Sequence, residues 1–312
     1  DLYGSSDIIL DKKIQNCVNT SIEYCITKCT EICDSLKLLY KHREDVRLQS
    51  PAIITIYDKL FGYTLAALRS IMNPSSERIQ SVRNDLEKCY DLLSTEKRYV
   101  SNELYENLQI IIDNLLKVFS NGYTFPKISM LADKILTGNY KKITIIVSDK
   151  EDKNSISIFW KNKFEANGYI ADIDILYPNE FLNLESFESD ITILTGWFNK
   201  KTMQRILFSY NTDNYLVLLY EYENRWKNAH TSVWKNACNK AGNKDIVEKS
   251  LGKEVRYISK NDYNETEPDN TLHDNSLDEL EEIDLILREH KYRQYISNRE
   301  AETTEALPVN FS

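Results

Sequence analysis

The sequence predicts an α/β fold, in which an N-terminal helical region (residues 1–139) precedes an open, mostly parallel sheet with helices on both faces (residues 140–260). Two patterns predict it. As far as about residue 133, apolar residues recur every three or four positions, as in "IIDNLLKVF", which is typical of amphipathic helices. From Lys142 onward, short runs rich in β-branched residues alternate with helical segments. Regular alternation favours right-handed crossovers between parallel strands.

The helical region is expected to hold four or five packed helices and no strand. Its breaks fall at Ser50-Pro51, at residues 73–76 and at residues 120–122, where Pro, Ser, Asn and Gly gather. Ser76 is expected to cap the helix that ends near Leu93.

The sheet is expected to use five strands, of which the first is buried and the last lies at an edge. These strands are residues 142–148, 170–176, 191–194, 215–219 and, at the edge, 254–259. The connecting helices are residues 155–167, a turn near Phe181, 200–210 and 222–238. An acidic linker (261–275) and a C-terminal helix with a truncated strand (276–312) should follow. The chain starts at Asp1 rather than Met and ends in "PVNFS", so we expect a part of a longer protein.

The charge balance argues against a protein that binds nucleic acid over its whole surface. The formal net charge is −9, but eleven acidic residues and a single basic residue, Arg288, lie between Asn261 and His290. The rest of the chain therefore carries nearly equal numbers of acidic and basic residues, so it could still present a local basic face. No run of 18 apolar residues predicts a membrane span, and no secretory leader is visible. The six cysteines are expected to be reduced in a cytoplasmic protein.

The cysteine cluster near the N-terminus does not predict a metal site. Cys25, Cys29 and Cys33 recur every four residues, with Cys17 upstream, so they would share one face of a helix. Cys25 and Cys33 would then be separated by about 12 Å of helix rise, whereas sulfurs on one zinc ion lie about 3.8 Å apart. We therefore expect a helix seam in which Cys packs as a compact apolar residue.

Phosphate-binding signatures are missing from the sequence. The loop after the first predicted strand, "SDKEDKNS", has no glycine, and no G-x-G-x-x-G occurs in the chain. A complete ATP or dinucleotide site is therefore not expected, and no cofactor is predicted.

Two adjacent strand ends supply the candidate contact residues. One strand ends at Thr195-Gly196-Trp197, and the next leads into Glu221 and Glu223. Gly196 would let a ligand or a neighbouring group approach the backbone, and Trp197 could stack on a base or pack on a partner. The alternative for both glutamates is a simple preference for a helix N-terminus.

Basic residues around this point could form a nucleic-acid contact. Arg225 could meet a phosphate or pair with Glu221, and Trp226 could be a ligand contact or core. The other members of this basic set are Lys200, Lys201, Arg205, Lys227, Lys235 and Lys240. With aromatic residues interleaved they could hold single-stranded nucleic acid, although solvated helix faces have the same pattern.

The stretch "SDITILTGWFNKKTMQRILFSYNTDNYLVLLYEYENRW" resembles the motor-distal half of helicase-like proteins, in particular DrmE of the bacterial DISARM antiphage systems. The similarity spans about residues 140–240 and rests on the Thr195-Gly196-Trp197 strand end, a helix carrying Met203 and Leu207, and "LLYEYE" before Arg225-Trp226. The resemblance implies a RecA/Rossmann-like domain whose ATP-binding lobe is elsewhere or degenerate. It carries over no catalytic residue.

Three functions remain open from the sequence. The first is a helicase-like antiphage defence component that contacts nucleic acid, such as DNA, or other defence-complex subunits. It would have no complete ATP site of its own and would not bind a membrane. The second is a non-enzymatic interaction scaffold with a degenerate α/β domain. The third is a Rossmann-like enzyme that uses Thr195, Glu221 and Glu223.

Overall fold

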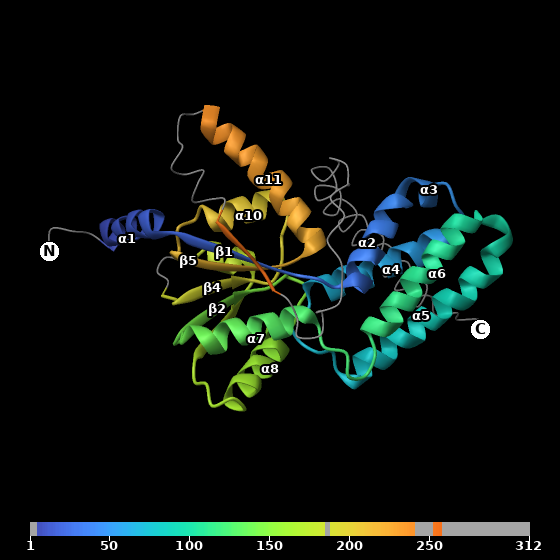
Figure 1. Cartoon of the computed structure of the whole chain (residues 1–312), viewed down its shortest axis with the longest axis horizontal. Coiled ribbons are helices and arrows are strands. Elements are labelled where there is room, and N and C mark those ends of the chain that lie inside the picture. The colour runs from blue at the N-terminus through green and yellow to red at the C-terminus, as the bar shows by residue number, and fades with distance from the viewer. Residues whose placement is uncertain (1–4, 185–187, 241–251, 258–312) are drawn as a thin grey trace, which may run out of the picture.

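The computed structural model describes residues 5–184, 188–240 and 252–257. It is an α/β protein with an open, all-parallel sheet flanked by helices and a helical bundle to one side (Figure 1). The strand order is β3-β2-β4-β5-β1-β6. The strands are β1 (Ser21–Thr27), β2 (Lys142–Ile146), β3 (Asp172–Leu176), β4 (Ile191–Leu194), β5 (Asn214–Tyr220) and β6 (Lys253–Arg256). The predicted fold class is confirmed.

Helices cover both faces of the sheet. Figure 1 shows α7 (Pro126–Gly138) and α8 (Lys153–Glu165) on one face, with α10 (Lys200–Leu207) and α11 (Glu221–Lys240) on the other. A short helix, α9 (Pro178–Leu182), follows β3, and α1 (Ser5–Asn19) precedes β1. The strands and helices after Lys142 lie where the sequence predicts them, and β6 is an edge strand. The predicted linker and the segment 276–312 lie outside the described residues.

The prediction that the first 139 residues contain no strand is wrong. Residues 21–27 form β1, which pairs in parallel with both β5 and β6 inside the sheet. Ile22, Tyr24 and Ile26 are all buried there. A short apolar run cannot be assigned to strand or helix by its periodicity alone, and here pairing with two neighbours decides for the strand.

The remaining helices of the N-terminal region pack together as a bundle that lies in the chain between β1 and α7 (Figure 1). They are α2 (Thr30–Lys41), α3 (Arg43–Arg47), α4 (Pro51–Arg69), α5 (Ser76–Glu96) and α6 (Asn102–Val118), with the 3₁₀ turn η1 (Lys97–Tyr99). Ser75, one residue before the predicted cap, accepts a hydrogen bond from the backbone of Arg78 and caps α5.

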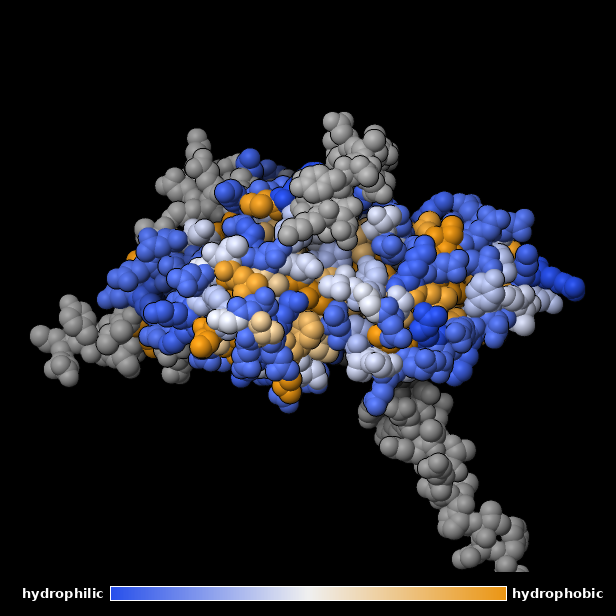
Figure 2. All heavy atoms as spheres, turned by 60° about the horizontal axis from the view of Figure 1, so that its bottom comes forward, coloured by the Kyte–Doolittle hydropathy of each residue, from blue (hydrophilic) through white to orange (hydrophobic). Residues whose placement is uncertain are grey.

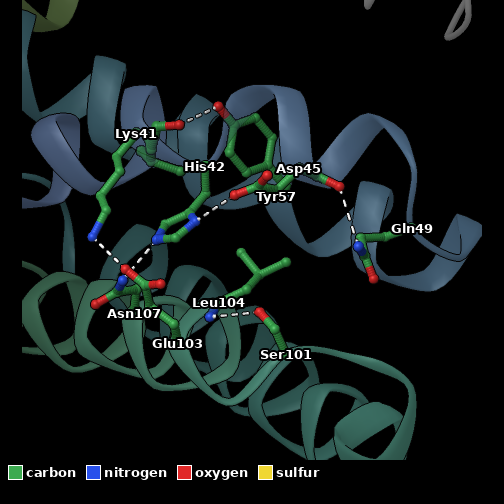
Figure 3. Close-up of polar contacts among 10 residues, drawn as sticks. Lys41, His42, Asp45, Gln49, Tyr57, Ser101, Glu103, Leu104 and Asn107 are labelled. Carbon is green, nitrogen blue, oxygen red and sulfur yellow. Dashed lines mark hydrogen bonds and ion pairs between the residues drawn. The ribbon is translucent and has the colours of Figure 1, made fainter.

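Buried polar groups link the helices of the bundle (Figure 3). The His42 ring, which is buried at the end of α2, lies 3.0 Å from Asp45 Oδ2 through Nδ1 and 2.7 Å from Asn107 Nδ2 through Nε2. The Tyr57 hydroxyl of α4 donates to the carbonyl oxygen of Leu39 at 2.7 Å. Because these buried polar groups have hydrogen-bond partners, they help to fix the relative positions of α2, α4 and α6.

The surface is polar with scattered apolar side chains. Figure 2 shows one such face, where apolar residues interrupt the polar surface at several places over the sheet and the bundle. The most exposed large apolar side chains among the described residues include Leu48, Tyr99 and Ile170. Single exposed apolar residues are common on globular proteins.

Candidate functional site

The two strand ends singled out in the sequence meet at one edge of the sheet. β4 and β5 are parallel neighbours, so Thr195-Gly196-Trp197 and the start of α11 both lie at the carboxyl edge. The backbone N–H of Trp197 donates to Oε1 of Glu223 at 3.0 Å. The prediction that these segments come together is confirmed.

A buried ion pair occupies this edge. Nζ of Lys127, in α7, lies 2.6 Å from Oε2 of Glu223, and both side chains are almost completely buried. The ammonium group also donates to the carbonyl oxygens of Leu68 at 2.9 Å and Thr195 at 2.8 Å. Its three donors therefore meet three acceptors, drawn from α4, from the end of β4 and from α11.

Burial lowers the pKa of Lys127, while the negative charge of Glu223 acts in the opposite direction. The Lys127 ammonium also lies 4.6 Å from the centroid of the Tyr220 ring, at the end of β5. The fold can accommodate the buried Lys127 ammonium because each of its three hydrogen-bond donors has an acceptor.

Both carboxylate oxygens of Glu223 likewise accept hydrogen bonds. Oε1 accepts from the Trp197 N–H, and Oε2 accepts from the Tyr220 N–H at 2.9 Å as well as from Lys127. The carboxylate thus ties the end of β4 to the end of β5 and to the first turn of α11. It serves the fold rather than facing an open site.

Gly196 is required by this carboxylate. A Cβ built on Gly196 would lie 2.5 Å from Glu223 Oε1 and 3.4 Å from Lys127 Nζ. Of the two reasons predicted for the glycine, close approach by a neighbouring group accounts for it.

The two candidate tryptophans lie in the interior. Trp197 is 2% exposed and packs against the rings of Tyr24 and Trp234. Its Nε1 donates to Nδ1 of His230 at 2.8 Å. Trp226 is 1% exposed and packs edge-on against Tyr222. Neither ring is placed to stack on a nucleic-acid base.

The bundle reaches over the neighbouring strand ends as well. The chain reverses direction across the sheet between β2 and β4, which is where open parallel sheets bind ligands. At this point Arg69 of α4 donates from Nη1 to the Ser148 hydroxyl at 3.3 Å. Together with the Leu68 carbonyl, Arg69 brings the end of α4 against the ends of β2 and β4. Side chains of the protein itself therefore occupy this part of the sheet edge.

Of the remaining candidates, Thr195 is buried, whereas Glu221 and Arg225 lie closer to solvent. Thr195 accepts from Lys127 through its backbone, and its own hydroxyl is buried without a hydrogen-bond partner in the described part of the chain. Glu221 is half-buried in the first turn of α11, where a helix N-terminus favours a carboxylate. The half-buried Arg225 lies with its guanidinium 5.1 Å from the centroid of the Tyr222 ring. The predicted catalytic use of Thr195 with Glu221 and Glu223 gains no support, because Glu223 is fully engaged.

Two helices on one face of the sheet carry exposed basic residues, and their acidic residues are confined to the first turn of α11. Lys201 and Arg205 of α10 and Lys235 of α11 are exposed, and Lys200 is half-exposed. No Asp or Glu occurs in α10, or in α11 after Glu223. The end of α10 reaches α11, since the ring of Phe208, the residue that follows α10, lies 5.6 Å from the Trp234 ring between centroids. We call Lys200, Lys201, Arg205 and Lys235 the α10–α11 basic face.

Other members of the predicted basic set do not join this face. Lys227 is buried and forms an ion pair with Glu254 of β6. The side chain of Lys240 lies outside the described residues.

The cysteines have a different arrangement from the predicted helix seam. Cys25 lies in β1, Cys29 precedes α2 as its N-cap residue and Cys33 lies within α2. All three are free and buried, and burial raises the pKa of the Cys25 thiol to about 12 and that of Cys29 to about 11. Within the described ranges no group of three His, Cys, Asp or Glu side chains could hold a metal ion. The cysteines therefore lie in a strand–helix unit rather than a helix seam, and Cys25 and Cys29 make polar contacts there with Glu23 and Tyr123.

Comparison with protein-family models and with curated proteins gave no significant match for this chain. Among the described residues, no helix has the length and apolar character needed to cross a membrane.

Proposed function

We propose that this chain is a helicase-like component of a bacterial antiphage defence system of the DISARM type, and that it contacts nucleic acid in the cytoplasm without a complete ATP site of its own. The observation that carries the proposal is the α10–α11 basic face. In a chain of net charge −9, four basic side chains reach solvent on two adjoining helices whose acidic residues, Glu221 and Glu223, both lie in the first turn of α11. Phosphate groups are the natural counterions of such a surface.

The residues at the carboxyl edge of the sheet support the part of the proposal that gives this chain no complete ATP site. Nucleotide phosphates bind in folds of this kind at glycine-rich loops and helix N-termini beyond the strand ends. Here the Lys127–Glu223 pair and Arg69 lie at those strand ends. The resemblance to DrmE supplies the defence setting, and other subunits of the same system are the expected protein partners.

Two measurements test this proposal. The first is a gel-shift titration of the intact protein with DNA at low and at moderate salt, where binding that weakens steeply with salt is expected. The second is the plating efficiency of phage on bacteria that carry the complete system. A variant with Lys200, Lys201 and Arg205 changed to Gln is expected to lose protection, and a variant with Lys117, Lys161 and Lys163 changed to Gln is expected to keep it.

The control variant removes the same charge from other surfaces. Lys117 lies in α6, and Lys161 and Lys163 lie in α8, which covers the opposite face of the sheet (Figure 1). If the protein binds no DNA but co-purifies with other defence subunits, the alternative function, a non-enzymatic interaction scaffold, replaces the proposed one.

A further inference from the structure

We infer that the α10–α11 basic face binds duplex nucleic acid through its phosphate backbone, and does not bind single strands by base stacking. This inference rests on the proposed function and names the class of ligand for the same surface. It departs from the single-strand interpretation of the sequence because of where the aromatic rings lie.

The aromatic side chains next to this face point into the protein. Trp197, Phe198, Tyr222, Trp226 and Trp234 are each at most 7% exposed. Phe208 is half-buried and packs edge-on against Trp234. Proteins that hold single strands without sequence preference depend on exposed aromatic rings, each worth about 1–3 kcal/mol per stacked base. The described residues of α10 and α11 offer no such ring to solvent.

What these helices do present is charge and hydrogen-bond donors. The exposed polar residues on the two helices, besides the basic ones, are Gln204, Asn228, Ser232 and Asn236. Side chains of these types donate to phosphate oxygens, and they fix position on a backbone without reading its sequence. A surface of this composition is suited to contacts with phosphates.

Charge density then selects between the two forms of nucleic acid. Duplex DNA carries about one negative charge for every 1.7 Å of its axis, about twice the density of one strand. Lys201 and Arg205 are four residues apart on α10 and so lie one helical turn apart on the same side. Lys200 lies close enough to α11 for its charge to lower the pKa of His230, after the larger effect of burial. Lys200, Lys201 and Arg205 thus place three positive charges on the single short helix α10, which favours the more highly charged ligand.

Three acidic side chains of α11 and its neighbouring elements are already engaged in ion pairs. Glu223 forms an ion pair with Lys127, and Glu254 of β6 forms an ion pair with Lys227. Glu180 of α9, the helix that packs on α10, pairs with Lys153 at 2.6 Å.

Fluorescence anisotropy with a labelled duplex and with one of its separated strands tests the inference on the full chain. The wild-type protein is expected to bind the duplex about tenfold more tightly than the single strand at about 50 mM salt. Changing Lys200, Lys201 and Arg205 to Gln is expected to weaken duplex binding about tenfold. The same variant should make the slope of log K against log salt shallower by about 2.7, or about 0.9 for each lost phosphate contact. The Lys117, Lys161 and Lys163 control should retain wild-type affinity and slope.

The other outcomes contradict different parts of the inference. Equal or tighter binding of the single strand overturns the duplex inference and leaves the proposed function standing. Equal losses in the two triple variants would show that binding follows net charge, which overturns the assignment to this face. No binding of either ligand at about 50 mM salt overturns the proposed function itself. Circular dichroism and thermal unfolding of both variants establish that they are folded, since all six positions are surface sites on helices.

Discussion

Lys127 and Glu223, 96 residues apart in the chain, form a buried ion pair of 2.6 Å at the carboxyl edge of the sheet. Lys127 brings α7 and, through the Leu68 carbonyl, the end of α4 to this point, and Glu223 brings β4, β5 and α11. The pair therefore joins the helical bundle to the sheet where related folds bind nucleotides.

Replacing Lys127 with Met should destabilise the protein by about 3–5 kcal/mol, because it leaves the Glu223 carboxylate buried without its countercharge. Urea denaturation measures the change. The control is Lys142→Met, which breaks an exposed pair with Glu188 and should change the free energy of unfolding very little. Adding Glu223→Gln to Lys127→Met should cost less than the sum of the two single changes. If Lys127→Met is as stable as the control, the pair does not hold the two parts together.

Much of this arrangement could be predicted from the sequence. The strands after Lys142 are short β-branched runs between polar loops, and the parallel order of β4 and β5 follows from the helix between them. That logic brings Gly196 and Glu223 to one edge. It does not reveal that the two positions contact each other, because both a ligand site and a buried carboxylate require a glycine there.

Lys127 and β1 could not be assigned in the same way. Lys127 has one visible signal, since it falls four residues before Leu131 and eight before Ile135 on the buried side of α7. A lysine on an apolar face suggests burial, but its partner lies 96 residues away and only the fold brings them together. The cysteine spacing around β1 favoured a helix, whereas residues 21–27 form a strand because they pair with β5 and β6.

Gly196→Ala should destabilise the protein by about 1–3 kcal/mol, because the new Cβ would meet a carboxylate held by three hydrogen bonds. The control is Gly62→Ala in the exposed part of α4, where nothing lies within 4 Å of the added atom. That change should stabilise the helix by about 0.5–1 kcal/mol. Thermal unfolding of both variants gives the comparison. Equal effects would mean that Glu223 yields easily and does not require the glycine.

Asp190 is expected to make stability depend on pH in the acid range. Its Oδ2 accepts from the backbone N–H groups of Lys141 at 2.6 Å and Lys142 at 2.9 Å, and these bonds lower the pKa of the carboxyl group. A lowered pKa contributes stability above the unfolded-state value of about 4, and the contribution is lost as pH falls through the folded-state value. Because the group is exposed, we expect Asp190→Asn to cost less than about 1 kcal/mol at neutral pH.

The measurement for Asp190 is urea denaturation between pH 7 and the acid limit of the folded state. The wild-type protein and the Asp190→Asn variant should converge in stability as the pH falls. Asp174→Asn, which removes an exposed carboxylate of β3, is the control for a general loss of negative charge. A constant difference between wild type and Asp190→Asn at every pH would contradict the prediction.

His230 should produce a second pH dependence, at higher pH. Burial, followed by the charge of Lys200, lowers the pKa of the imidazole to about 4. Its Nδ1 accepts from Trp197 Nε1, so the neutral ring is the form that the fold requires. A histidine with a lowered pKa contributes stability fully above its unfolded value of about 6.5, and this is lost as pH falls from there toward the folded value. The loss amounts to about 3 kcal/mol if no other group compensates.

Replacing His230 with Gln separates this effect from general acid destabilisation. The Gln side chain can still accept from Trp197 but does not titrate, so the fall in stability between about pH 6.5 and 4 should shrink by about 3 kcal/mol relative to wild type. Trp197→Phe removes the donor and keeps the imidazole, so its stability should fall over that pH interval as the wild type does, from a lower starting value. Denaturant unfolding across this pH range gives all three curves. Parallel curves for wild type and His230→Gln would show that the buried imidazole does not set the acid stability of this edge of the sheet.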